Sequence, residues 1–222
     1  MDNEIKNIVF DMGNVLTIFH QREYIYRYVE NEEDFTWIKN HLCGSVEWLQ
    51  MDRGAVTDDE AIASICERVP EHLHNTVERF IREFRMVHLP NPPMEQLVEE
   101  LSQKGYDLYL MSNTSHRFRT FSKFIKSIAY MKGIWISCEH GLLKPEPEAY
   151  QDFFQTFSLK PEECFFIDDT PANIEAAKNQ GMQGCVYYND VEELRHFLRK
   201  AGVKVSYFGG LGEHNEENNR VI

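Results

Sequence analysis

The pattern of apolar and polar positions changes near residue 86. Beyond it, short apolar runs alternate with segments whose apolar residues recur with helical spacing. The runs predict strands and the periodic segments predict helices. The predicted strands are 106–113, 133–140, 164–169 and 184–188, and the predicted helices are 117–127, 146–158, 172–181 and 191–202. Strands that alternate with helices predict an α/β fold, namely a doubly wound (Rossmann-like) parallel sheet with right-handed crossovers.

The N-terminal part of the chain does not follow this rhythm. Ile8, Val9 and Phe10 predict a buried strand, but only helical patterns come after it. These patterns cover 22–30, 34–42, 45–52, 57–69 and 74–87. A long helical insertion directly after the first strand would form a lid over the functional site. A helical subdomain that only packs on the sheet is the alternative.

We therefore predict three parts. Residues 1–19 and 87–205 form the α/β core, residues 20–86 form an inserted α-helical cap subdomain, and residues 206–222 form a polar C-terminal tail. Within the cap, Thr57 and Glu60 have the spacing of a helix capping box.

Composition narrows the classes of partner. The chain has 222 residues and a formal net charge of -13, so its average surface repels nucleic acids and anionic membranes. No signal peptide or membrane-spanning run is visible. The five cysteines are widely spaced, and Cys138, Cys164 and Cys185 lie in apolar runs that predict buried free thiols. We expect a soluble, cytoplasmic protein, a monomer or small homo-oligomer, with no nucleic-acid or membrane partner.

Polar residues stand where the predicted core strands end or in the loops beyond them. They are Asp11, Ser112 with Asn113, Lys144, and Asp168 with Asp169. Taken singly, each has an ordinary explanation as a helix cap, a turn residue or a surface charge. In doubly wound sheets, however, the ligand lies outside the carboxyl ends of the strands. Together these side chains offer carboxylates for Mg²⁺ and a lysine and a hydroxyl for a phosphate group.

The same segments resemble the motifs of the haloacid dehalogenase-like (HAD) hydrolases. The resemblance covers nearly the whole chain, with the motifs in the family's order: "VFDMGNVL", "LMSNTS", the lysine of "LLKPEPEAY", and "FFIDDTPANIEAA". The segment 20–86 resembles the α-helical cap of one branch. Within that branch the chain is most similar to glucose-1-phosphatase-like enzymes, and more distantly to the N-terminal phosphatase domain of soluble epoxide hydrolases.

The resemblance implies a Mg²⁺-dependent phosphatase acting on small phosphorylated metabolites, and it implies roles for the site residues. Asp11 would be the nucleophile that forms an aspartyl-phosphate. The implied Mg²⁺ ligands are Asp11, the backbone carbonyl of Gly13, Asp169 and Asp168, the last bound directly, through water or not at all. The implied phosphate ligands are Ser112, Asn113 and Lys144, and Lys144 would also steady Asp11. Asn173 stands where many relatives carry an acid and would give only a supporting hydrogen bond.

Gly13 departs from the family pattern. Most phosphatases of the family carry an aspartate there that protonates the leaving oxygen, and glycine cannot do so. A phosphatase whose proton comes from water, a cap residue or a substrate hydroxyl is one reading. A weakly active or non-catalytic binding or regulatory protein is another, and a haloacid dehalogenase is a third, although that enzyme carries an aromatic residue at this position. For a phosphatase without this acid, we predict a preference for substrates with good leaving groups, such as sugar 1-phosphates.

Two further features have ordinary explanations. His20 lies just after the first motif and could donate a proton, but a surface or packing histidine is the simpler reading. The cap aromatics predict core packing, although one or two of them could stack on a sugar ring. These aromatic residues are Tyr24, Tyr28, Trp37 and Trp48.

Overall fold

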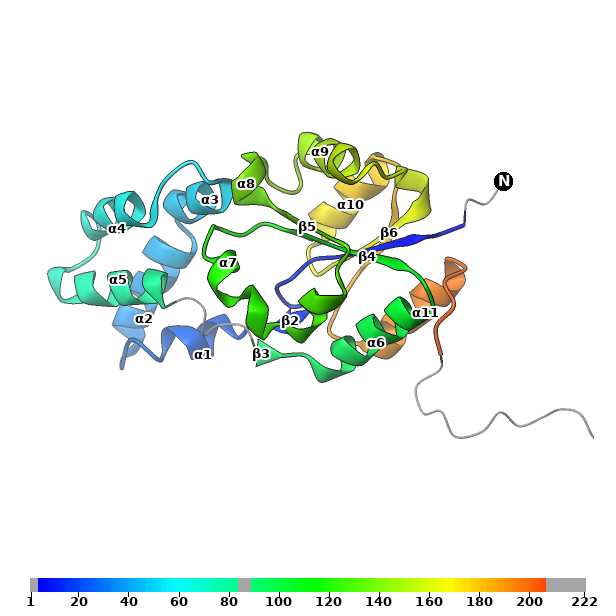
Figure 1. The fold of residues 1–222 in the computed structure, drawn as a ribbon. Coiled ribbons are helices and arrows are strands. Elements are labelled where there is room, and N and C mark those ends of the chain that lie inside the picture. Colours follow the sequence, from blue (N-terminus) through cyan, green and yellow to red (C-terminus); the bar gives the residue numbers. More distant parts are fainter. Residues whose placement is uncertain (1–3, 84–88, 207–222) are drawn as a thin grey trace, which may run out of the picture.

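The computed structural model describes residues 4–83 and 89–206. Its centre is a five-stranded parallel sheet with the strand order β5-β4-β1-β6-β7 (Figure 1). The strands are β1 (Asn7–Phe10), β4 (Asp107–Ser112), β5 (Gly133–Ile136), β6 (Cys164–Asp168) and β7 (Gln183–Val186). The predicted α/β class and parallel sheet are therefore confirmed. Because β1 lies between β4 and β6, the carboxyl ends of these three strands are neighbours.

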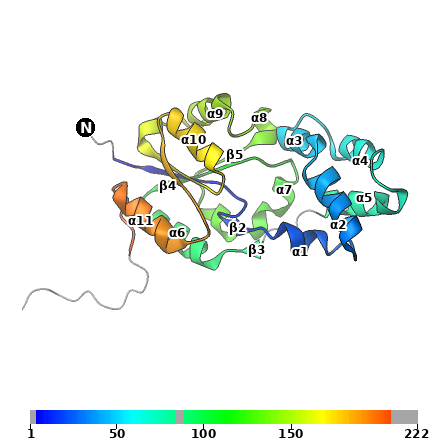
Figure 2. The same cartoon turned by 180° about the vertical axis from the view of Figure 1, so that it is seen from behind.

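Helices cover both faces of the sheet (Figures 1 and 2). One face packs against α6 (Pro92–Gln103) and α11 (Val191–Lys200), and the other against α9 (Pro147–Phe157) and α10 (Pro171–Asn179). Side chains alternate along β1, so that Ile8 and Phe10 enter the first of these cores and Val9 the second. All three residues are 0% exposed, as expected for a central strand of a doubly wound sheet.

The cap has its own hydrophobic core. Its helices are α1 (Gln21–Ile25), α2 (Glu32–Ile38), α3 (Val46–Arg53), α4 (Asp58–Cys66) and α5 (His74–Arg82). Short helical turns also occur at Lys39–Cys43 and Glu71–Leu73. The apolar faces of the helices enclose a cluster that includes Ile38, Ile65 and Phe80. The predicted capping box of Thr57 and Glu60 is present at the start of α4. We call α1–α5 the cap, and Figure 1 shows it at one end of the sheet.

The segments on either side of the cap meet in a small ribbon. β2 (Thr17–Ile18) pairs antiparallel with β3 (Leu89–Pro90). The chain therefore enters and leaves the cap region at one place beside the core. The predicted C-terminal tail lies outside the described residues, apart from Ser206.

The predicted strand 133–140 is wrong in its second half. The chain leaves the sheet after Ile136 and forms the short helix α8 (Ser137–His140). The backbone N–H of Thr114 donates to the hydroxyl of Ser137 at 2.9 Å, which ties this turn to the end of the neighbouring strand. This tertiary contact opposes the β propensity of the apolar run.

Two predicted helices are shorter than expected. The segment 117–127 forms only α7 (Phe118–Phe121), followed by tight turns at Ser122–Phe124 and Lys126–Tyr130, because Ile125 between the turns is extended. The segment 22–30 forms only α1. Beyond it, N–H groups bond carbonyls three residues earlier, so the helix passes into tight turns.

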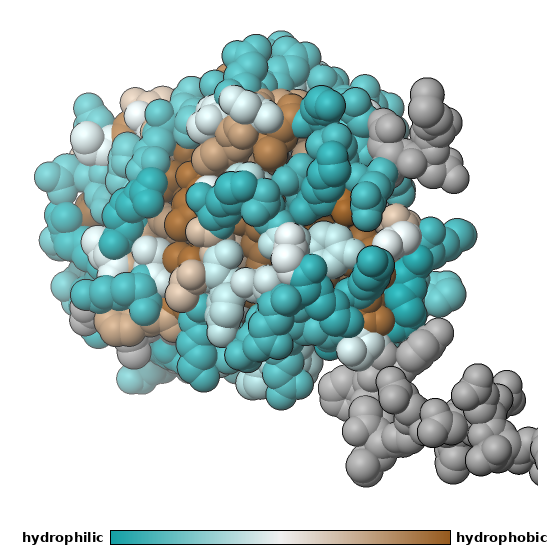
Figure 3. All heavy atoms as spheres, turned by 45° about the vertical axis from the view of Figure 1, so that its right-hand side comes forward, coloured by the Kyte–Doolittle hydropathy of each residue, from teal (hydrophilic) through white to brown (hydrophobic). Residues whose placement is uncertain are grey.

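The predicted burial of the three cysteines in the apolar runs is confirmed. Cys138, Cys164 and Cys185 are buried free thiols. No helix among the described residues has both the length and the apolar character needed to span a membrane. Figure 3 shows one face of the molecule, where hydrophilic residues cover much of the surface and apolar residues are visible between them.

Candidate active site

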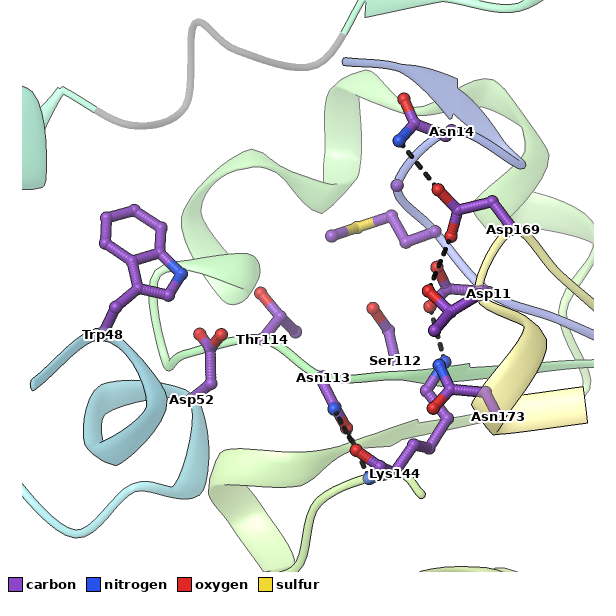
Figure 4. A pocket seen from close by; sticks show the side chains of 13 residues that line it. Asp11, Asn14, Trp48, Asp52, Ser112, Asn113, Thr114, Lys144, Asp169 and Asn173 are labelled. Atoms are coloured by element: carbon purple, nitrogen blue, oxygen red, sulfur yellow. Dashed lines mark hydrogen bonds and ion pairs between the residues drawn. The ribbon is translucent and has the colours of Figure 1, made fainter. Parts of the chain in front are cut away.

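The predicted site residues meet at the carboxyl edge of the sheet, and all of them except the buried Asp168 line one pocket of about 250 Å³ (Figure 4). Asp11 directly follows β1, Ser112 ends β4, and Asp169 directly follows β6. Lys144 comes from the loop between α8 and α9. Because adjacent parallel strands end at the same edge, residues far apart in the sequence share this pocket. The lining residues are Asp11, Met12, Gly13, Asn14, Trp48, Asp52, Ser112, Asn113, Thr114, Lys144, Asp169, Thr170 and Asn173.

Lys144 lies between two carboxylates. Its Nζ donates to Oδ1 of Asp11 at 2.8 Å and to Oδ2 of Asp168 at 2.6 Å, and its side chain is only 1% exposed. Burial alone lowers the pKa of Lys144, but the charges of Asp11 and Asp168 outweigh burial and raise the pKa above its ordinary value. Lys144 is therefore a permanent positive charge in the site.

Asp11 is a carboxyl group in an environment that disfavours its charge. Burial raises its pKa to about 6, the Lys144 charge opposes this rise, and the Asp168 charge adds to it. Because Lys144 occupies Oδ1, the other oxygen of Asp11 is the one left for chemistry. The arrangement suits a nucleophile that is oriented by one contact and still reactive at its second oxygen.

Asp168 makes its hydrogen bonds to protein groups. Oδ1 accepts from the backbone N–H of Thr170 at 2.8 Å, and Nδ2 of Asn173 lies 3.0 Å from each of the two carboxylate oxygens. With Lys144 on Oδ2 as well, the side chain is 0% exposed. Asp168 thus positions Lys144 and is itself held by Asn173. The contact of Asn173 is the supporting hydrogen bond that the sequence predicts.

The side chain of Asp169 is held by Asn14, a residue of the first motif. Oδ2 of Asp169 accepts from Nδ2 of Asn14 at 2.8 Å, and Oδ1 of Asn14 accepts from the backbone N–H of Phe19 at 3.2 Å. Asn14 has φ 56, in the left-handed region that asparagine tolerates better than most residues. This conformation turns its amide towards Asp169 (Figure 4). Asn14 was not among the site residues predicted from the sequence, although an asparagine after a glycine is a local signal for such a turn.

The donor set fits a hard divalent cation. Asp11, Asp168 and Asp169 each offer a carboxylate oxygen, and these atoms all lie within 4.8 Å of one another. In this cluster Lys144 supplies one positive charge against three negative ones, so a further cation would balance the site. Oxygen ligands of this kind suit Mg²⁺, which also keeps several waters or phosphate oxygens. Because Asp11 and Asp169 line the pocket, whereas Asp168 is 0% exposed and does not, Asp11 and Asp169 are the better placed ligands.

The phosphate-binding candidates lie at the end of β4. Ser112 is 2% exposed and lines the pocket. The side chain of Asn113 bonds the backbone of Lys144 twice, donating to its carbonyl at 2.8 Å and accepting from its N–H at 2.9 Å. Asn113 therefore joins the β4 edge to the lysine loop. This contact leaves the backbone of Asn113, rather than its side chain, as the group for a phosphate.

Gly13 lines the pocket without being sterically required. A Cβ added at this position would have no heavy atom within 4 Å. The backbone at residue 13 therefore has room for a side chain in place of the hydrogen of glycine. The absence of an acidic side chain at residue 13 is therefore not explained by a lack of space.

The cap contributes residues to the pocket that the sequence analysis did not assign as site residues. Trp48 and Asp52 of α3 lie across the pocket from Asp11 and Asp169 (Figure 4). Thr114, which follows β4, also lines it. The only signal for Asp52 is an acid in the last turn of a helix, where the helix dipole disfavours it. Trp48 was among the aromatics expected in the cap core, and it does pack against that core while also lining the pocket.

The remaining candidates lie elsewhere. His20 lines a neighbouring cavity together with Asn14 and Asp169. Tyr24 is 2% exposed inside the cap core, and Tyr28 and Trp37 pack against that core. The core-packing prediction for these three aromatics is confirmed.

Comparisons with known proteins identify the family of the chain. A family model described as haloacid dehalogenase-like hydrolase matches residues 5–181. The chain is 29% identical over 113 residues to flavin mononucleotide hydrolase 1 of Arabidopsis thaliana. That match covers 51% of the chain and 46% of the relative, so the chain spans less than half of that protein's length.

Two further relatives match over most of the chain. The chain is 25% identical to the D-ribitol-5-phosphate phosphatase of Bacteroides thetaiotaomicron, with 81% of the chain and 90% of that protein covered. A HAD family enzyme of the same organism, solved in complex with magnesium and inorganic phosphate, has the same fold with a TM-score of 0.68. It is 23% identical and covers 86% of this chain and 98% of its own. On the family match, the chain belongs to the haloacid dehalogenase-like hydrolases.

Proposed function

We propose that this protein is a Mg²⁺-dependent phosphatase of small phosphorylated metabolites that works through an aspartyl-phosphate on Asp11. One observation carries the proposal. The buried Lys144 holds one oxygen of Asp11 inside a cluster of three carboxylates at the sheet edge. Similarity to a protein named D-ribitol-5-phosphate phosphatase supports the reaction type. A binding module would not need a buried, charged lysine aimed at a half-occupied carboxylate.

The reaction then has two steps. The second oxygen of Asp11 attacks phosphorus, the bond from phosphorus to the leaving oxygen breaks, and that oxygen keeps the electron pair and takes a proton. Water next attacks the phosphorus of the aspartyl-phosphate, which releases inorganic phosphate and restores the Asp11 carboxylate. Lys144 holds Asp11 in place and neutralises phosphoryl oxygens in both steps. Ser112 and the backbone of Asn113 bind the remaining phosphoryl oxygens.

Mg²⁺ would be held by Asp11, Asp169 and the backbone carbonyl of Gly13. When bound, it supplies positive charge that lets a phosphate dianion enter a site rich in carboxylates. Asp168 acts by positioning Lys144. Asn14 and Asn173 keep Asp169 and Asp168 in place through the hydrogen bonds described above.

Gly13 determines which substrates react well. Without an acid at this position, charge on the leaving oxygen is not neutralised by a proton from residue 13. Substrates whose leaving oxygen tolerates negative charge are therefore favoured, and an anomeric hydroxyl is more acidic than the 6-hydroxyl of the same sugar. We infer that sugar 1-phosphates are better substrates than sugar 6-phosphates.

The test is phosphate release from a panel of sugar phosphates and nucleotides, with Mg²⁺ and with EDTA, using Asp11→Asn as the blank. We expect Mg²⁺-dependent release that is clearly faster from glucose 1-phosphate than from glucose 6-phosphate. Release that continues undiminished in EDTA would contradict the cation requirement. Faster release from glucose 6-phosphate would contradict the leaving-group argument alone.

A further inference from the structure

Two cap side chains face the phosphoryl site from the other side of the pocket. Trp48 and Asp52 are four residues apart on α3, so they lie on the same face of that helix. Both line the pocket that contains Asp11, Ser112 and Lys144 (Figure 4). They stand where the part of a substrate beyond its phosphate group would lie.

Contacts between cap and core fix the position of Asp52. The hydroxyl of Ser137 donates to the backbone carbonyl of Asp52. The next residue, Arg53, donates to the carbonyl of Gly141 at 3.0 Å and forms an ion pair with Glu146. We call these contacts, together with the packing of Gly54, the α3 clamp.

Gly54 completes the α3 clamp by allowing a close approach. It has φ 73, and a Cβ added there would lie 2.3 Å from the carbonyl oxygen of Cys138. The clamp is also connected to the catalytic loop, because Glu146 accepts from the backbone N–H of Leu143 at 3.1 Å, one residue before Lys144. Asp52 is thus held in a defined position relative to Lys144.

Trp48 is held from the core as well. The guanidinium of Arg117 lies 5.5 Å from the centre of the Trp48 ring, and Phe80 makes an edge contact at 6.3 Å. Arg117 also bonds Asp58 of the cap, so the arginine joins the two parts beside the indole. The indole is therefore a positioned surface at the pocket wall.

The surroundings of Asp52 do not favour a charged carboxyl group. It is the second-last residue of α3, near the negative end of the helix dipole. Burial raises its pKa to about 7, against the opposing charge of Arg117 and hydrogen bonds from the Ser115 backbone and from Trp48. A carboxyl group has room for several hydrogen-bond partners. A residue so placed is unfavourable for stability but suited to binding hydroxyl groups.

We propose that Trp48 and Asp52 form the subsite for the leaving group and select polyhydroxylated, uncharged leaving groups, namely sugars or polyols. Asp52 accepts hydrogen bonds from hydroxyls of the leaving group, and the indole packs against its carbon skeleton. In its ionised form, Asp52 repels leaving groups that carry a second phosphate or a carboxylate. This inference rests on the proposed function and names the substrate class of the same site.

The test compares substrates that reach the subsite with one that does not. Rates are measured with Mg²⁺ at about pH 8, where Asp52 is mostly ionised although its pKa is raised to about 7. The substrates are glucose 1-phosphate, glucose 1,6-bisphosphate and acetyl phosphate, whose leaving group is small and carries no hydroxyl. For Asp52→Ala we expect kcat/KM to fall about 10- to 100-fold on glucose 1-phosphate, mostly through KM, because hydrogen bonds to a charged group are lost. On acetyl phosphate the expected change is less than about threefold.

A second variant removes the charge with almost no change in shape. For Asp52→Asn we expect turnover of glucose 1,6-bisphosphate to rise relative to glucose 1-phosphate. The matched control is Asp59→Asn, the same change at a cap side chain that is 80% exposed, which should alter none of the three substrates. Urea unfolding of each variant separates a folding defect from a binding defect.

The outcomes are distinguishable. Wild-type protein that releases no phosphate from any of the three substrates overturns the proposed function, and the subsite with it. An active wild type whose Asp52 variants lose glucose 1-phosphate and acetyl phosphate turnover equally, or lose neither, overturns the subsite alone. Loss confined to glucose 1-phosphate, with relaxed rejection of the bisphosphate in Asp52→Asn, supports it.

Discussion

The charge of Lys144 is predicted to hold the acidic cluster together when no cation is added, and Lys144→Met tests this. The substitution keeps much of the side-chain length and removes two charge-assisted hydrogen bonds, of 2.8 and 2.6 Å, to Asp11 and Asp168. The side chain of Lys144 is 1% exposed, that of Asp11 13% and that of Asp168 0%, so water does not replace the lost contacts. Removing one partner from a buried ion pair typically destabilises by about 3–5 kcal/mol. We expect a loss of this size in urea unfolding at about pH 8 with EDTA.

The loss should depend on pH in a defined direction. In wild type the pKa of Asp11 is already raised from 3.8 to about 6, chiefly by burial, and Lys144 opposes this rise. Without the lysine the pKa of Asp11 rises further in the folded state. A group whose pKa is higher folded than unfolded contributes stability below its unfolded pKa and loses it as pH rises through the folded pKa. The deficit of Lys144→Met should therefore be small near pH 4 and largest above pH 7.

The control is Lys126→Met, which removes a lysine that is 79% exposed and pairs with Glu95 at 3.3 Å. A surface pair of this kind contributes less than about 1 kcal/mol, so its loss should be small at every pH. Added Mg²⁺ should narrow the deficit of Lys144→Met and leave that of Lys126→Met unchanged. A Lys144→Met protein as stable as wild type at about pH 8 in EDTA would refute the argument that the lysine compensates buried charge.

Three further substitutions test separate parts of the account. Gly13→Asp places a side chain in open space at the pocket wall. It should raise kcat/KM on glucose 6-phosphate at least about tenfold, because it supplies an acid for the leaving oxygen. If the ratio of kcat/KM on glucose 6-phosphate to that on glucose 1-phosphate stays unchanged, the leaving-group explanation is wrong. Glu47→Gln should lower the free energy of unfolding by only about 1 kcal/mol at neutral pH, because its partner Arg68 is 41% exposed. The pKa of Glu47 is lowered to about 2, chiefly by the hydrogen bond from Arg68. The difference in unfolding free energy between Glu47→Gln and wild type should therefore shrink as the pH falls from 4.5, the ordinary pKa of a glutamate, towards 2. A difference that grows in acid contradicts this. Gly54→Ala places a methyl group against the carbonyl of Cys138 and should destabilise by at least about 1–2 kcal/mol in urea unfolding, whereas unchanged stability would mean that the α3 clamp is loose.

The core could be predicted from the sequence because its signals are local. Apolar runs define the strands, and a parallel sheet places the ends of neighbouring strands together whatever the details of the loops. The motif order then placed Asp11, Ser112, Lys144 and Asp169 at one edge, and the structure brings these residues into one pocket. The ends of the helices and strands were less predictable. The turn after Ile136, for example, depends on a contact with Thr114, which is far away in the sequence at the end of the neighbouring strand.

The cap side of the pocket could not be predicted in the same way. Trp48 and Asp52 have the spacing of an ordinary helix face, and the sequence does not say which face meets the core. Their placement depends on contacts between distant residues, such as that of Arg53 with Glu146. The turn at Asn14 has a local signal in the sequence, but its hydrogen bond to Asp169 joins residues from two motifs and has none.

The most direct test of the central claim is the rate of Mg²⁺-dependent phosphate release by Asp11→Asn, measured on glucose 1-phosphate beside wild type. Circular dichroism of both proteins ensures that the variant is folded. An amide cannot act as the attacking oxyanion, so we expect the rate to fall at least about 1,000-fold. A folded Asp11→Asn protein that releases phosphate at a rate near that of wild type would contradict the assignment of Asp11 as the nucleophile.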